Sequence, residues 1–202
     1  MRRAPVRGLA LFVLSGAVAA CGSRTVPPPE AGTVQGFAPD LRGRRVMLLP
    51  VQQNLGVPGD PDAELAYGLQ TRVAGIGWVL PAELEEVLAR SPAVQARTRG
   101  LQVGNFLSAE VERVGDPLYG ELRRLASLVD ADVVLLPVQA ALAAVPEGDP
   151  SVRLWTGLID VRSGRVMWFS VLDGEPFPRG DPRGLASAVD ELARTLLWYA
   201  TN

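Results

Sequence analysis

The first long apolar run beyond the amino-terminal region reads Arg45-Val46-Met47-Leu48-Leu49-Pro50-Val51-Gln52. Its apolar residues are consecutive rather than alternating, which is typical of a strand buried on both faces in a parallel sheet. A second run, Val133-Val134-Leu135-Leu136-Pro137-Val138-Gln139, repeats the pentapeptide Leu-Leu-Pro-Val-Gln. We expect both runs to be central strands of an α/β sheet.

Helices and further strands are predicted around these two runs. Four segments have apolar residues at helical spacing, near 62–73, 81–90, 116–129 and 184–200. Three more segments have the character of strands, 78–80, 151–161 and 165–172, and the last two form a hairpin at Ser163-Gly164. The order of these elements is β-α-β-α-α-β-β-β-α, and a helical turn is expected over 108–112 in addition. The predicted fold class is therefore α/β, a single domain with a five-stranded mixed sheet and helices packed on it.

Composition excludes several classes of chemistry. The chain of 202 residues contains no His and one Cys, and its 20 basic residues are all Arg. Without His there is no Ser-His-Asp triad and no imidazole-ligated zinc, and without Lys there is no P-loop lysine and no Schiff base. A net charge of −2 argues against a nucleic-acid partner, because such binders present a basic surface. We expect no metal and no cofactor.

The first 20 residues have the pattern of a secretory signal peptide. Three arginines within the first seven residues precede an uncharged apolar stretch, 8–20, which is shorter than the roughly 20 residues needed to span a bilayer. The stretch ends at Val18, Ala19, Ala20 and Cys21, which resemble a bacterial lipobox. The resemblance implies cleavage before Cys21 and acylation of Cys21, which would anchor the chain to a membrane. An ordinary signal peptide followed by an incidental cysteine is the alternative.

The segment 21–41 is rich in Pro and Gly and has no periodicity, which is typical of a flexible linker. We therefore predict a lipoprotein signal peptide over 1–20, the lipidated cysteine with its linker over 21–41, and a periplasmic α/β domain over 42–202. Gly22 stands where an Asp would resemble the inner-membrane retention signal of enteric bacteria. The expected location is therefore the outer membrane, with the domain facing the periplasm.

Gln52 and Gln139 end the two copies of the pentapeptide and allow two interpretations. In the first, both copies are central parallel strands with the same burial, and the Pro marks where ladder pairing stops. In the second, the two glutamines, with Gln53 and Asn54 of the following loop, line a crevice at the carboxyl ends of adjacent strands, where open α/β sheets bind ligands. Amide side chains would hydrogen-bond a polar ligand or a peptide backbone, but they supply no nucleophile and no acid.

Three segments of the domain carry a family resemblance. They are the helix Pro81-Ala82-Glu83-Leu84-Glu85-Glu86-Val87-Leu88, the strand Ala131-Asp132-Val133-Val134-Leu135-Leu136, and the hairpin turn from Asp160 to Trp168. Together they resemble the periplasmic α/β domain shared by the TolB amino-terminal domain, the curli-secretion lipoprotein CsgG and the LpoB-type activators of penicillin-binding proteins. The resemblance covers roughly 44–200 and implies a fold more than a function.

The function expected from these features is a non-catalytic binding or accessory module in envelope assembly or maintenance. It would be anchored to the membrane through acylated Cys21 and would bind an envelope protein. The sequence does not decide between a monomer and an oligomer. One alternative is a subunit of a ring-shaped outer-membrane export assembly, as the resemblance to CsgG implies. Another is a carboxylate-based cell-wall hydrolase, although the acidic residues Glu83, Glu85 and Glu86 fit a helix start better than a facing catalytic pair.

Overall fold

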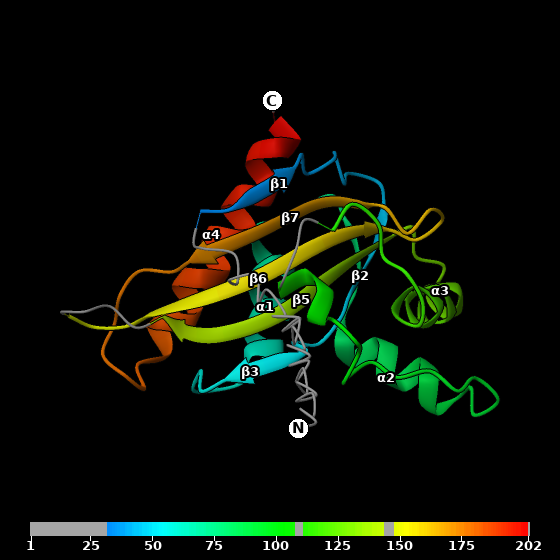
Figure 1. The fold of residues 1–202 in the computed structure, drawn as a ribbon, viewed down its shortest axis with the longest axis horizontal. Helices are drawn as coiled ribbons and strands as arrows, with labels where there is room; N and C mark the ends of the chain where they lie inside the picture. Colours follow the sequence, from blue (N-terminus) through cyan, green and yellow to red (C-terminus); the bar gives the residue numbers. More distant parts are fainter. Residues whose placement is uncertain (1–31, 108–110, 144–147, 202) are drawn as a thin grey trace, which may run out of the picture.

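A computed structural model of the protein describes residues 32–107, 111–143 and 148–201, and Figure 1 shows their arrangement. The strands form one mixed sheet with the order β1-β7-β6-β5-β2-β4, and β3 also pairs with β5. The α/β fold class is confirmed, but the sheet has seven strands rather than the five expected. The strands are β1 (Val34–Gly36), β2 (Arg45–Leu48), β3 (Gln53–Leu55), β4 (Gly77–Val79), β5 (Val133–Ala143), β6 (Ser151–Asp160) and β7 (Val166–Asp173).

The four longer helices lie where the periodicity predicts them. They are α1 (Pro61–Arg72), α2 (Pro81–Ala89), α3 (Leu118–Val129) and α4 (Pro182–Thr201). Asp60 caps α1, because its side chain accepts hydrogen bonds from the backbone N–H groups of Asp62 and Ala63, both at 3.1 Å. The turn expected over 108–112 falls partly outside the described residues, and the short 3₁₀ helix η1 (Gly104–Leu107) precedes it.

The two copies of Leu-Leu-Pro-Val-Gln lie side by side. Strand β2 runs parallel to β5 with Leu48 opposite Leu135, so the two copies start in register. Pairing stops at Pro50 and resumes one residue out of step, with Gln53 of β3 opposite Gln139 of β5. The strands β2 and β3 therefore follow the same edge of β5. The two copies are thus adjacent buried parallel strands, as the first interpretation expects. The ladder stops at the Pro only in the first copy, because β5 continues through Pro137, which lies opposite Thr156 of β6.

Helices cover both faces of the sheet. Helices α1 and α4 pack on one face, where Leu65, Leu69, Val189 and Leu192 are buried in one cluster. Helices α2 and α3 lie together on the other face, where their apolar residues join the second cluster, which includes Leu84, Leu118, Leu122 and Leu125. Apolar residues of the central strands alternate between the two clusters, which explains their unbroken apolar sequence.

Strand β1 lies within the stretch that the sequence indicated as a linker. It pairs antiparallel with β7, and the following residues Ala38 and Leu41 are buried. Gly36 has a φ of 74° and lies so close to the carbonyl oxygen of Met167 that a Cβ would overlap it, so this position requires glycine. The folded part therefore begins before the expected boundary at residue 42. Together with β3, which lies in an expected loop, β1 accounts for the two additional strands.

The hairpin between β6 and β7 turns at Ser163-Gly164, as predicted. Asp160 accepts hydrogen bonds from the backbone N–H of Ser163 at 2.8 Å and from its hydroxyl at 2.6 Å. Partial burial alone would raise the pKa of Asp160, but these hydrogen bonds and the nearby charges of Arg44 and Arg162 hold it below its ordinary value. Ionised Asp160 thus stabilises the turn.

Candidate functional site

A groove runs between helix α3 and the irregular segment 93–102. It consists of two hollows, of about 970 and 520 Å³, which share Gln95 and Glu121 in their linings. We call it the α3 groove. One wall is the segment 93–102 and the other is the exposed side of α3, with Pro117 at its start. The polar and charged residues that line it are Gln95, Arg97, Gln102, Glu121, Arg123, Arg124 and Ser127.

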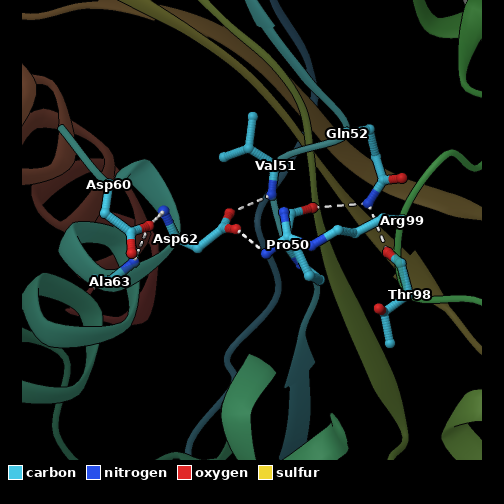
Figure 2. A network of polar contacts seen from close by, with 8 residues as sticks. All are labelled: Pro50, Val51, Gln52, Asp60, Asp62, Ala63, Thr98 and Arg99. Carbon is cyan, nitrogen blue, oxygen red and sulfur yellow. Dashed lines mark hydrogen bonds and ion pairs between the residues drawn. The ribbon is translucent and has the colours of Figure 1, made fainter. Parts of the chain in front are cut away.

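Gln52 holds the segment 93–102 in place (Figure 2). Its amide nitrogen donates hydrogen bonds to the carbonyl oxygens of Pro50 at 2.7 Å and Thr98 at 2.9 Å. Its amide oxygen accepts a hydrogen bond from the backbone N–H of Leu101 at 3.0 Å. These bonds join the end of β2 to a segment more than forty residues away in the sequence. Gln52 is therefore a support for one wall of the α3 groove.

Asp62 supplies a second connection to the same wall. Its carboxylate accepts a hydrogen bond from the backbone N–H of Val51 at 2.6 Å and forms an ion pair with Arg99 at 2.5 Å (Figure 2). The Asp62 side chain is 14% exposed, whereas that of Arg99 is 58% exposed. The bond to the buried Val51 is consequently worth more than the solvent-screened ion pair. Helix α1, the segment between β2 and β3, and the groove wall thus meet at one carboxylate.

Helix α3 presents apolar residues to the core and arginines to the groove. Leu122 and Leu125 are buried, while Arg123 and Arg124 are exposed on the opposite side of the helix. The N-cap position of the helix is Pro117, and the side chain of Asp116 just before it accepts a hydrogen bond from the backbone N–H of Gly120 at 3.0 Å. The first turn of the helix is thereby fixed at the point where the two hollows meet.

The charges in the α3 groove do not balance. Glu121 is occupied by Arg124, whose guanidinium lies 2.6 Å from its carboxylate, and by the backbone N–H of Arg97 at 3.4 Å. Among the described residues, no carboxylate forms an ion pair with the guanidinium of Arg97 or Arg123. Arg123 instead lies over the ring of Tyr119, 5.6 Å from its centroid. The groove therefore has a positive excess on a protein with a net charge of −2.

The residues expected to form a ligand crevice come together only in part. Gln53 and Gln139 are opposite each other on β3 and β5. The side chain of Asn54 stabilises a turn. Its amide oxygen accepts a hydrogen bond from the backbone N–H of Val57 at 2.9 Å, and its amide nitrogen donates one to the carbonyl oxygen of Val57 at 3.2 Å. The amides of Gln52 and Asn54 thus have partners within the protein. A ligand role for Gln53 and Gln139 stays a prediction.

The lipobox residues Val18, Ala19, Ala20 and Cys21 lie outside the described residues. Within the described ranges, no group of three or more His, Cys, Asp and Glu side chains is placed to hold a metal ion. In the same part of the chain, none of the helices combines the length with the apolar character that a bilayer crossing needs.

Sequence reasoning missed the groove itself. Nothing in the local sequence distinguishes Arg97 and Arg123 from arginines of a solvated face, and the segment 93–115 has no periodicity that could place it beside α3. The available signal was Asp62, an acidic residue in the first turn of a helix that directly follows the loop after β2. Its partner Arg99 lies 37 residues further along the chain, and no local pattern connects the two.

Comparisons with known proteins give similar folds at low sequence identity. No protein-family model matches the chain, and no curated protein matches it in sequence. A PelC dodecamer from Paraburkholderia phytofirmans is similar with 18% identity and a TM-score of 0.47, over 83% of this chain and 95% of that one. Lipoprotein GNA1162 from Neisseria meningitidis is similar with 16% identity and a TM-score of 0.43, over 79% and 99%. The LpoB carboxyl-terminal domain from Escherichia coli is similar with 16% identity and a TM-score of 0.41, over 67% and 84%. LpoB is one of the lipoproteins that the sequence pattern resembles.

Proposed function

We propose that the protein is a non-catalytic lipoprotein of the outer membrane whose periplasmic domain binds an acidic, extended segment of another envelope protein in the α3 groove. The anchor in this proposal is Cys21, supported by the lipobox-like Val18-Ala19-Ala20-Cys21 behind a short apolar stretch. The single observation that carries the binding role is the positive excess in the α3 groove.

The shape of the groove fits an extended peptide. Its two hollows adjoin along α3, and the wall opposite the helix is irregular chain rather than a second helix. A peptide lying there would meet the guanidinium groups of Arg97 and Arg123, which can each form paired hydrogen bonds with a carboxylate. Because Glu121 is already occupied by Arg124, it would not repel the acidic segment with its full charge.

The binding role is tested by cross-linking in the intact envelope. A photoactivatable residue in place of Gln95, which lines both hollows, should give one discrete adduct. Mass spectrometry of the adduct should map it to a segment rich in Asp and Glu. The double variant Arg97→Glu with Arg123→Glu should lose the adduct. The control Arg179→Glu makes a charge change of the same kind on an exposed loop outside the groove and should keep it. An adduct that survives the double variant, or that maps to a neutral segment, contradicts the proposal.

The anchor is tested separately. Mass spectrometry of the amino-terminal peptide should show Cys21 acylated after cleavage, and Cys21→Ser should release the protein from the membrane fraction. An unmodified cysteine on a membrane-bound protein would contradict the lipoprotein part of the proposal and leave the binding role standing.

A further inference from the structure

Arg113 and Arg165 lie opposite each other on neighbouring backbone segments near β1, the first strand of the described chain. Arg113 and Arg165 form an isolated antiparallel bridge. The backbone N–H of Val114 donates to the carbonyl oxygen of Gly164 at 2.8 Å, and that of Val166 donates to the carbonyl oxygen of Glu112 at 2.9 Å. These bonds flank the arginines, so the two form a non-hydrogen-bonded pair, the kind in which opposite side chains lie closest.

This pairing places two positive charges side by side. Like charges directly opposite each other destabilise a strand pair. Both arginines are exposed, and no carboxylate of the described residues forms an ion pair with either of them. Glu112 lines the same hollow but is the chain neighbour of Arg113, and side chains alternate along an extended segment. A pair of adjacent guanidinium groups is suited to bind one phosphate.

The arginine pair opens into a hollow that β1 also lines. The hollow has a volume of about 770 Å³, and its walls include Gln35, Gly36 and Phe37 beside the two arginines. Phe37 is 80% exposed. Asp40, which follows shortly afterwards, is engaged by Arg42 at 2.6 Å, and the hydrogen bonds from Arg42 lower the pKa of Asp40 to about 2. This carboxylate therefore already has a cationic partner.

The position of the anchor identifies the source of the phosphate. The described chain enters the fold at Gly32, whose N–H donates to the carbonyl oxygen of Val171 on β7. About 11 residues separate Gly32 from Cys21, and a chain of that length spans at most about 40 Å. The surface with Arg113, Arg165 and Phe37 is therefore never far from the bilayer that holds the acyl chains. Arginine beside an exposed aromatic ring is the combination found at membrane interfaces.

We infer that Arg113 and Arg165 bind the phosphate of an anionic phospholipid headgroup, with Phe37 at the membrane surface, so that the anchored domain rests on its own membrane on this side. This inference rests on the anchor of the proposed function. Binding of the headgroup would fix the orientation of the domain as well as its distance from the membrane, since an acyl anchor alone leaves the domain free to rotate.

The test uses the full acylated protein in vesicles, either of phosphatidylcholine alone or with phosphatidylglycerol added. Phe37→Trp adds a fluorophore at the proposed contact to the four native tryptophans, so its signal is taken as the difference from the unsubstituted protein. Vesicles containing brominated lipid quench this signal on contact. Tyr67→Trp is the matched control, because Tyr67 is 63% exposed but lies on α1. Flotation of the vesicles with the protein reports the anchor independently.

We expect at least a twofold quenching of the signal from Phe37→Trp in vesicles with phosphatidylglycerol, and little in phosphatidylcholine or for Tyr67→Trp. Adding Arg113→Glu and Arg165→Glu should abolish the quenching while flotation persists. Flotation without quenching would overturn the inference and leave the anchor intact. Equal quenching in both kinds of vesicle would show that the arginines do not select an anionic headgroup, and quenching that survives the charge reversal would show that they do not bind a lipid phosphate; either result overturns the inference. Loss of flotation would refute the anchor and the inference with it.

Discussion

Removal of the Gln52 side chain should loosen one wall of the α3 groove. Gln52→Ala deletes three hydrogen bonds, two donated to the carbonyl oxygens of Pro50 and Thr98 and one accepted from Leu101. Each such bond contributes about 0.5–1.5 kcal/mol net, so we expect a loss of about 2–4 kcal/mol in the free energy of unfolding. For a chain of this size that lowers Tm by roughly 4–16 °C.

The substitution is measured by urea unfolding and by hydrogen exchange of the Leu101 amide, which should exchange far faster in Gln52→Ala. The matched control is Gln53→Ala, the next residue, which is half-buried and for which no side-chain hydrogen bond joins it to the described residues. It should change stability by less than about 0.5 kcal/mol. Gln52→Glu should cost at least as much as Gln52→Ala at neutral pH, because a carboxylate oxygen would then face two carbonyl oxygens. If Gln52→Ala and Gln53→Ala are equally mild and Leu101 stays protected, the supporting role of Gln52 is refuted.

Three further predictions concern the elements around the site. Asp62→Ala leaves the buried N–H of Val51 without its acceptor and should lower the free energy of unfolding in urea by about 2 kcal/mol. Arg99→Ala removes only a screened ion pair and should lower it by under about 1 kcal/mol; equal costs would contradict this ranking. Gly68→Ala should destabilise the protein by about 1–3 kcal/mol, because the new Cβ would overlap the side chain of Val189 on α4. In a double-mutant cycle, Val189→Ala in the same chain should recover part of this loss; additive costs would refute the contact. The lowered pKa of Asp160 stabilises the native state above the unfolded-state pKa near 4, and this contribution disappears as pH falls through the native pKa. Asp160→Asn should therefore destabilise the protein at pH 7 and progressively less in acid; a cost independent of pH would contradict it.

Long periodic segments of this fold were predictable from the sequence, and short ones were not. The runs that became β2 and β5 are consecutive apolar residues, and burial on both faces is their simplest explanation. The stripe of Leu118, Leu122 and Leu125 placed α3 correctly, because its spacing matches one helical face. Strands β1 and β3 have three residues each, and their composition is that of loops. They are strands only because long neighbours, β7 and β5, offer them ladder partners.

The candidate site was less predictable than the fold for a related reason. The repeat drew attention to Gln52, but the expected role was contact with a ligand, and the residue lies between β2 and β3 rather than at a strand end. Its partners Thr98 and Leu101 belong to a segment without periodicity, so their position depends on tertiary contacts. The bridge between Arg113 and Arg165 joins an irregular segment to a hairpin strand, and no pattern of either segment alone indicates it.

The strand order also has a consequence for biosynthesis. Strand β2 has its parallel partner β5 roughly 90 residues further along the chain, and β5 gains its antiparallel partner β6 only after that. A chain emerging from the ribosome therefore cannot close the middle of its sheet until most of its length has been made. If residues 1–20 direct export, as their pattern predicts, this delay keeps the leading portion extended while it threads a translocation channel. The late synthesis of β5 would then postpone folding until the chain has crossed the membrane.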